Sequence, residues 1–295
     1  MTSPRSLLTR PSALALAVTA VITTGQARAA DSGYTELDQV VVTESRTAPD
    51  TDVLVTQDSL EKKQATDLDD IFSDTPDVAV GGSAPGAQKI YVRGVEDTQL
   101  NVSVDGATQA GQIFHHQGRV TVDPELLKQV EVSAGAGEAT NGPGALGGAI
   151  RFVTKDPEDM LRPGQDVGGT LKTEYYSNTD GYKTSASLYG NLTDNWSAMG
   201  TLSRTELGEY KDGNGETQPY TDSELLTGFG KVVGQLTDEQ KVSLSYERTE
   251  DEAFRPFKAH FPGSWSTPID QEVLRETITG KYGFTPATTI WWIPS

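Results

Sequence analysis

The 295-residue chain contains no cysteine, so disulfide bonds cannot stabilise its fold. After residue 22 it also lacks any run of 18 or more apolar residues, which excludes a membrane-spanning helix in that part of the chain. Strands of a membrane β-barrel are not excluded, because half of the residues in each such strand are polar. The stability of the fold must therefore come from an ordinary core, from a closed sheet, or from both.

Positive charge is scarce, because the chain has 24 Lys and Arg residues and 42 Asp and Glu residues, which gives a formal net charge of −18. Residues 1–29 hold three of the arginines and no acid, so the remainder has 21 basic and 42 acidic residues and a net charge of −21. A chain this acidic is not expected to bind nucleic acid or anionic phospholipid.

Motifs of catalysis are missing as well. The sequence has no nucleophile elbow and no His-Glu-x-x-His. Its glycine-rich stretch 135–148 has Thr140 where a dinucleotide fingerprint needs glycine, and Pro143 follows Gly142 where a phosphate loop needs lysine. We therefore predict that the chain is not an enzyme, holds no cofactor and has no metal site of its own, and that these glycines permit turns.

The first 29 residues have the pattern of a secretory signal peptide. Arg5 and Arg10 precede the apolar run 13–22, and Ala27-Arg28-Ala29 forms a small-x-small cleavage site. The alternative is a retained anchor helix, but the apolar run is too short to span ~30 Å of hydrocarbon. We expect cleavage after Ala29 and export across an inner membrane.

Residues 30–52 are polar except for "LDQVVVTESR" at 37–46, a β-branched island. Such a segment can add as a strand to the sheet edge of another protein, or it can be the first strand of the chain's own fold.

Residues 53–162 predict a mixed α+β domain. One helical face runs from a Ser59 cap to the stop at Pro76, and Asp123-Pro124-Glu125 begins a short helix. Strand-like runs occupy 89–94, 99–106 and 129–135, and another strand follows the glycine-rich stretch.

From residue 163 onward the polarity alternates with period two. This predicts six strands, at 169–176, 183–190, 195–205, 225–236, 241–249 and 276–284. Short turns at 192–195 and 236–239 alternate with long polar loops at 206–222 and 250–270, as in an outer-membrane barrel. A soluble β-sandwich is the alternative, but its inner face would be more apolar than the serines, threonines and methionine of these strands.

Two of the three histidines, His115 and His116, are adjacent within "GQIFHHQGRV" at 111–120. On one extended strand they would point to opposite sides and could not share an ion, whereas in a turn they could. Three interpretations stay open: a polar lining that hydrogen-bonds the organic shell of a chelated metal, direct ligation of haem or a metal, and a solvated turn. The first is favoured, because no carboxylate stands near to orient the rings.

The ordered set of "DQVVVTESR", "YVRGVED", "VSVDG", "PELLKQVEV" and "GALGGAIRFVTK", followed by antiparallel strands, resembles the TonB-dependent outer-membrane receptors. The resemblance covers residues 37–285. It implies an α+β plug domain (53–162) inside an antiparallel transmembrane β-barrel whose N-terminal part is 163–285, and the complete barrels of this family have about 22 strands.

The resemblance also assigns residues by position. The TonB box, which binds the periplasmic protein TonB, would be Asp38, Gln39, Val40, Val41, Val42 and Thr43 within the segment 30–52. The ligand site at the plug apex would include His115, His116, Gln117 and Arg119. Arg93 and Gly94, with Gly147 and Gly148, would be structural positions of the plug.

Two departures from the family pattern stand out. Ala134-Gly135-Ala136 replaces the usual Arg-Gly-Pro after the "VEV" strand, so a charge cluster that ties plug to barrel lacks an arginine. Six strands cannot close a plugged barrel, and residues 286–295 lose the alternation, which predicts an incomplete barrel with a tail from a truncation or a frameshift.

The function implied by the resemblance is that of a monomeric receptor in the outer membrane of a Gram-negative bacterium, in contact with outer-membrane lipid and with TonB. Its ligand would be a small metal chelate. A ferric siderophore is favoured, with haem, copper or cobalamin complexes as alternatives. A secreted β-rich adhesin or structural protein is the alternative from a different class, and it would use the strands without needing the TonB box.

Overall fold

The computed structural model describes residues 51–82, 85–110, 116–135, 141–260 and 266–286. Every described residue belongs to one compact unit, which begins at residue 47 and is called here the second unit. The expected signal peptide, the TonB box at 38–43, His115 and the tail from residue 287 lie outside the described residues.

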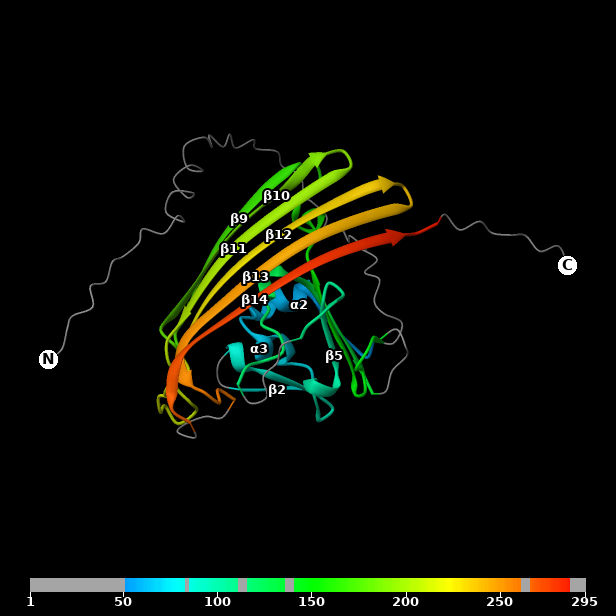
Figure 1. The fold of residues 1–295 in the computed structure, drawn as a ribbon. Coiled ribbons are helices and arrows are strands. Elements are labelled where there is room, and N and C mark those ends of the chain that lie inside the picture. The colour runs from blue at the N-terminus through cyan, green and yellow to red at the C-terminus, as the bar shows by residue number, and fades with distance from the viewer. Residues whose placement is uncertain (1–50, 83–84, 111–115, 136–140, 261–265, 287–295) are drawn as a thin grey trace, which may run out of the picture. The chain divides into compact units, whose positions relative to one another are not determined.

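The N-terminal part of the second unit is an α+β domain of short elements (Figure 1). Its elements are β1 (Val53–Thr56), α2 (Gln57–Lys63), α3 (Leu68–Phe72), β2 (Val78–Gly81), η1 (Pro85–Ala87), β3 (Lys89–Val92), β4 (Val95–Glu96), η2 (Asp97–Gln99), β5 (Asn101–Val104), β6 (Ala107–Thr108), η3 (Pro124–Leu126), β7 (Leu127–Ala134), β8 (Gly148–Thr154) and α4 (Pro157–Met160). One sheet has the order β1-β7-β8-β5-β6 and is antiparallel except where β5 meets β8, and a small antiparallel sheet has the order β2-β3-β4.

The single helix expected from Ser59 to Pro76 is wrong, because the segment forms two helices. Thr56, not Ser59, caps α2, and its hydroxyl accepts from the Ser59 backbone N–H at 3.3 Å. Gln64 then adopts a left-handed conformation with φ of +51°, which ends α2, and Asp67 caps α3. Two side-chain caps and a left-handed residue therefore outweigh the continuous apolar periodicity.

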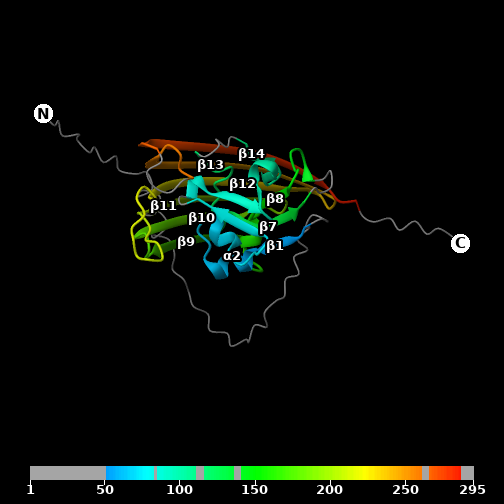
Figure 2. The ribbon, with the colours of Figure 1, turned by 90° about the horizontal axis from the view of Figure 1, so that it is seen from below.

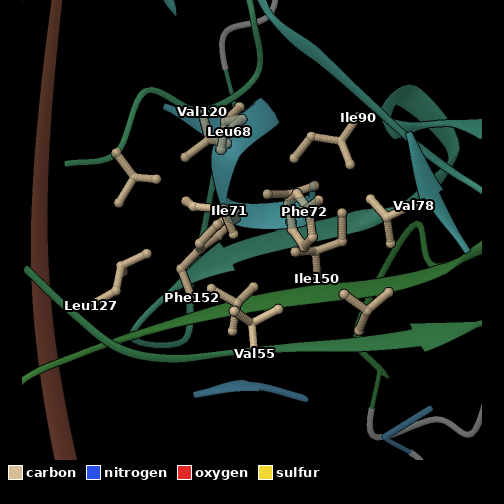
Figure 3. Close-up of a cluster of buried hydrophobic side chains, with 14 of the residues drawn as sticks. Val55, Leu68, Ile71, Phe72, Val78, Ile90, Val120, Leu127, Ile150 and Phe152 are labelled. Atoms are coloured by element: carbon tan, nitrogen blue, oxygen red, sulfur yellow. The ribbon is translucent and has the colours of Figure 1, made fainter. Parts of the chain in front are cut away.

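The core of the α+β domain lies between α3 and the five-stranded sheet (Figure 3). Ile71 and Phe72 of α3 pack toward Ile150 and Phe152 of β8, and all four side chains are buried. The rings of Phe72 and Phe152 meet edge-on, with centroids 6.5 Å apart. Burial of each large side chain stabilises the fold by about 1.5–3 kcal/mol, so this contact fixes α3 on the sheet.

The six predicted long strands are confirmed as one antiparallel sheet in sequence order (Figure 1). They are β9 (Val167–Tyr176), β10 (Gly181–Thr193), β11 (Trp196–Leu207), β12 (Ser223–Thr237), β13 (Gln240–Pro256) and β14 (Pro268–Phe284). Their register is regular except for one shift near Asn191 and one near Gln235, each beside a short turn.

One face of this six-stranded sheet is apolar and exposed, while the other is polar and buried. Exposed apolar side chains include Leu171, Leu188, Trp196, Leu202, Val232, Leu244, Tyr246, Ile278 and Tyr282, and the most exposed, Ile278, is 71% exposed. The opposite face carries buried Lys, Ser and Thr side chains. This is the reverse of a soluble sheet and is typical of a lipid-facing barrel wall, so the sandwich alternative fails.

The α+β domain lies against the polar face of the six-stranded sheet (Figure 2). A small apolar cluster joins the two layers, in which Leu126 of η3 packs with Tyr189, Met199 and Phe229 of the sheet. Among the described residues, no helix has the length and apolar character needed to cross a membrane.

Candidate functional site

The connections between the long strands define two ends of the six-stranded sheet. Residues 208–222 and 257–267 join strands at one end, called here the long-loop end. Residues 194–195 and 238–239 join strands at the other, called the short-turn end. Features of the α+β domain can therefore be placed along the sheet by the strand residues that they contact.

Asp105 is a central contact between the α+β domain and the sheet. It lies in the two-residue turn between β5 and β6, where Asp105 and Gly106 have φ of +52° and +89°, a combination that hairpin turns of this length require. Its carboxylate is buried and accepts from Lys231 Nζ at 3.3 Å and Lys281 Nζ at 3.1 Å. Thr154 donates to it through both its backbone N–H and its hydroxyl.

Asp156 extends this cluster toward the short-turn end. Its two carboxylate oxygens lie 2.8 Å from Lys231 Nζ and 2.9 Å from Lys241 Nζ. Lys231 therefore bridges Asp105 and Asp156, and it also donates to the Thr154 hydroxyl at 2.9 Å. An amino group that is 4% exposed thus has partners for all its hydrogens, as a buried charge requires.

A second cluster lies closer to the long-loop end. Lys183 of β10 donates to Asp123 at 2.5 Å, and the Ser203 hydroxyl of β11 donates to the other oxygen of Asp123 at 2.6 Å. Glu125, two residues along the chain, accepts from the Ser185 hydroxyl at 2.7 Å. The expected short helix after Asp123 is one turn of 3₁₀ helix, and it presents both carboxylates to the sheet.

The charges of these carboxylates follow from their surroundings. Burial opposes ionisation of Asp105, but the charges of Lys231 and Lys281 outweigh it, so the pKa of Asp105 lies below its ordinary value. The pKa of Asp123 is lowered despite burial by Lys183, and that of Asp156 is lowered despite burial by Lys231 and Lys241. All three are carboxylates at neutral pH.

The described residues that were expected to bind ligand, His116, Gln117 and Arg119, lie near the long-loop end. The His116 ring lies against the Phe257 ring, with centroids 4.1 Å apart, and Nδ1 of His116 is 2.6 Å from the carbonyl oxygen of Phe257. Phe257 begins the long connection after β13. Because the carbonyl only accepts, Nδ1 carries the hydrogen, and in the neutral imidazole Nε2 then has the lone pair. The carbonyl thus supplies the orienting partner that the sequence did not reveal.

Gln117 borders a groove between residues 107–110 and β14, lined there by Glu272–Ile278. Arg119 has a different setting, since its guanidinium donates to the backbone carbonyls of Gln109 and Asp97, at 3.1 Å and 2.6 Å. Arg275 of β14 donates to the Ala110 carbonyl at 3.2 Å from the other side. Arg119 therefore holds the segment that leads to the histidines.

A further cleft near the long-loop end was not expected from the sequence. It lies between α3 and the sheet and is lined by Thr66, Asp67, Gln88, Tyr176, Asn178, Thr179, Tyr210 and Thr221, among others. Burial raises the pKa of Asp67, whose oxygens accept from the Asp70 backbone and the Gln88 side chain. Both oxygens therefore serve the fold rather than a ligand.

The remaining predicted positions lie in the α+β domain. Arg93 and Gly94 form the two-residue turn between β3 and β4, with φ of +47° and +83°, and Arg93 pairs with Asp77 at 3.2 Å. A Cβ at Gly147 would lie 2.4 Å from Val95 Cγ1, and one at Gly148 would lie 2.0 Å from the Ser133 carbonyl oxygen. The described residues contain no group of three or more His, Asp or Glu side chains placed to hold a metal.

Sequence reasoning missed the carboxylate–lysine clusters. Asp105-Gly106 is a hairpin signal, and the period-two alternation already places Lys183 and Lys231 on the polar face. That these side chains meet could not be read from the sequence, because 126 residues separate Asp105 from Lys231.

Comparison with known proteins gives concordant results. The family model "TonB-dependent Receptor Plug Domain" matches residues 44–149. The chain is 35% identical over 240 residues to the Heme transporter BhuA of Brucella abortus, which covers 81% of this chain and 36% of the relative. It is 29% identical over 242 residues to the TonB-dependent heme receptor A of Haemophilus influenzae, which covers 80% of this chain and 32% of the relative.

Among solved structures, the FrpB iron transporter from Neisseria meningitidis (F3-3 variant) superposes with a TM-score of 0.71 and 26% identity, over 79% of this chain and 38% of that chain. The chain spans about a third of the length of the curated relatives it matches. These relatives are transporters and receptors.

Proposed function

We propose that this chain, which carries the plug domain and wall strands of a TonB-dependent outer-membrane receptor of a Gram-negative bacterium, takes part in haem uptake. The α+β domain is called the plug from here on, and the six-stranded sheet the wall. The observation that carries the choice of haem is the 35% identity to a haem transporter over 240 residues. A ferric siderophore, favoured by the sequence alone, becomes the second candidate, supported by the likeness to an iron transporter.

Within this proposal His116 is the residue that meets the haem iron. Its Nδ1 is engaged by the Phe257 carbonyl, which fixes the ring and leaves Nε2 as the free ligand atom. The Phe257 ring packs on the imidazole and restricts its rotation. Gln117 and His115 are proposed as neighbours of the ligand. Arg119 holds the segment before the histidines by donating to the backbone carbonyls of Gln109 and Asp97.

The coupling partner in this proposal is TonB, which binds residues 38–43 as an added strand. Movement of the plug then opens a path along the wall. No chemical bond in the ligand changes, so we propose that the protein is a transporter and not an enzyme.

Haem titration tests the assignment of His116. The protein, produced from its full reading frame, is titrated in detergent with haem and with iron-free protoporphyrin, as the parent and as His116→Ala. We expect His116→Ala to lower the haem affinity about tenfold or more, because it removes a ligand to the iron, and to leave the affinity for the iron-free ring nearly unchanged.

Asn214→Ala is the matched control, because Asn214 is exposed in the other long connection and its backbone N–H, which alanine keeps, donates to Asp212 of the same loop. An equal loss for both porphyrins would show that His116 shapes the pocket without touching iron. No binding of either porphyrin by the parent would overturn the haem proposal in favour of another ferric chelate.

A further inference from the structure

The inner face of the wall is dominated by cations. The inward-facing charged residues of the described strands are the cations Lys172, Lys183, Lys231, Lys241, Arg255, Arg275 and Lys281 and the acids Glu174, Glu247 and Asp251. Lys172 pairs with Glu174 at 2.7 Å, and Arg255 pairs with Asp251 at 2.6 Å. These two pairs are internal to the wall and leave the other cations to face the plug.

Four of those cations have ion-pair partners only in the plug among the described residues. They are Lys183 with Asp123 and Glu125, Lys231 with Asp105 and Asp156, Lys241 with Asp156 and Glu158, and Lys281 with Asp105. In every one of these ion pairs the wall supplies the cation and the plug the carboxylate. The ion pairs given above between plug and wall in the described part of the chain therefore share one polarity.

The composition of the plug matches this polarity. Residues 53–162 hold 9 Lys and Arg residues against 17 Asp and Glu residues, a net charge of −8. When the plug moves, these carboxylates move with it, and the wall lysines lose their partners. A cation left in a confined space without a counter-charge is costly, so any anion that enters is attracted to it.

The four lysines also lie at successive depths of the wall. Lys183 pairs across strands with Thr205 near the long-loop end, and Lys231 pairs with Met199 and Ser245 farther down. Lys241 and Lys281 lie near the short-turn end, where Lys281 pairs with Ser243. They therefore span the wall from one end to the other.

We propose that Lys183, Lys231, Lys241 and Lys281 form an anion track, which plug carboxylates occupy in the closed state and ligand carboxylates occupy during passage. The inference deepens the proposed function, on which it rests, because haem carries two propionate carboxylates. The inner face of the wall, in addition to the plug apex, then determines which chelates pass, and the wall lysines favour anionic chelates.

The test breaks one ion pair from either side. Asp105→Asn and Lys281→Gln each remove the 3.1 Å contact, but the first leaves the lysine in the wall and the second removes it. Asparagine tolerates the positive φ of Asp105 and keeps an oxygen for the Thr154 N–H, and the Lys281 side chain is 43% exposed, so both variants are expected to fold.

The first readout is uptake of radiolabelled haem by cells that produce the full reading frame. We expect uptake to be about fivefold lower in Lys281→Gln than in Asp105→Asn, the effect of losing one charge-assisted contact with the ligand. The difference should vanish for haem with methyl-esterified propionates. Equal uptake of haem by the two variants would mean that the ion pair only holds the plug against the wall. This result would overturn the anion track.

The second readout does not depend on haem. Proteoliposomes with either variant, in which the plug is loosened, are tested for leakage of an anionic and a cationic dye of equal size. We expect a preference for the anionic dye in Asp105→Asn that is several times weaker in Lys281→Gln. The same charge preference in both variants would refute the track even if haem is not the ligand, whereas absence of haem uptake by the parent refutes the proposed function alone.

Discussion

Three glycines that precede or begin β8 allow the cost of backbone strain to be separated from the cost of close packing. Gly144 has φ of +80° and nothing within 4 Å of an added Cβ, whereas Gly147 has no positive φ but a Cβ there would lie 2.4 Å from Val95 Cγ1. Gly148 combines both conditions, with φ of +126° and a Cβ that would lie 2.0 Å from the Ser133 carbonyl oxygen. The three alanine variants thus isolate strain, crowding and their sum.

The expected losses of plug stability follow from these geometries. Gly144→Ala should cost about 1–2 kcal/mol, the penalty of a left-handed conformation for a residue with a Cβ. Gly147→Ala should cost about 1–3 kcal/mol, since a valine side chain can give way by rotation. Gly148→Ala should cost about 3–5 kcal/mol, because the contacting atom is backbone and the pairing of β8 with Ser133 and Ala134 of β7 must open.

Hydrogen exchange at the amides of Val132 and Ile150, which pair across β7 and β8, measures these losses locally. Each 1.4 kcal/mol lowers the protection about tenfold, and the two expected costs differ by about 1 kcal/mol or more, so Gly148→Ala should lose at least about five times more protection than Gly144→Ala. Equal protection in those two variants would show that β7 and β8 are not packed as closely at Gly148 as described, and the reasoning from the Cβ contact would fail.

Of three shorter predictions, two concern the contacts between plug and wall and one concerns the TonB box. The pKa values of Asp105, Asp123 and Asp156 are lowered in the folded protein, so the stability that these carboxylates contribute is complete above the ordinary aspartate pKa of about 3.9 and is lost as the pH falls below it. Protection of the plug from protease, measured across pH 2–6, checks this dependence, and Asp123→Asn should make the protection vary less with pH. Asp123→Ala leaves Lys183 buried with Glu125 as its remaining acidic partner and should lower the free energy of unfolding by about 3–5 kcal/mol, against about 1 kcal/mol for Ser203→Ala. Chemical denaturation in detergent compares the two variants, and similar losses would contradict the buried ion pair. If residues 38–43 add to TonB as a strand, Val41→Pro should abolish and Val41→Ala only weaken capture by the C-terminal domain of TonB in a pull-down, and equal capture of the proline variant would refute the box.

The fold could be predicted from the sequence to the extent that it depends on local periodicity. The period-two alternation puts Leu202 and Leu244 on the apolar face and Ser203 and Glu247 on the polar face of their strands, and the structure exposes the first two side chains and buries the other two. The two helices in place of one at 57–72 escaped prediction, because Thr56 and Asp67 act through single hydrogen bonds that apolar periodicity does not report.

The ligand site was less accessible to sequence reasoning. The histidine pair is visible in the sequence, but the orientation of the His116 ring depends on the Phe257 carbonyl, 141 residues away. Arg119 was grouped with the ligand residues because the resemblance places its segment at the plug apex, and in the structure its guanidinium donates to the carbonyls of Gln109 and Asp97. A backbone carbonyl carries no sequence signal, so contacts of this kind become visible only once the chain is folded.

The difference from the family pattern after the "VEV" strand can be explained by the ion pairs between plug and wall. Ala134-Gly135-Ala136 lacks the arginine by which the plugs of the resembled family contact a barrel, and in this chain the plug contributes Asp105, Asp123 and Asp156 instead. If the plug moves during transport as proposed, its carboxylates carry negative charge away and the wall lysines leave positive charge along the wall. A wall carrying the carboxylates would instead repel anionic ligands once the plug had moved. The sign of the contact, and not only its strength, therefore bears on which ligands can follow the plug.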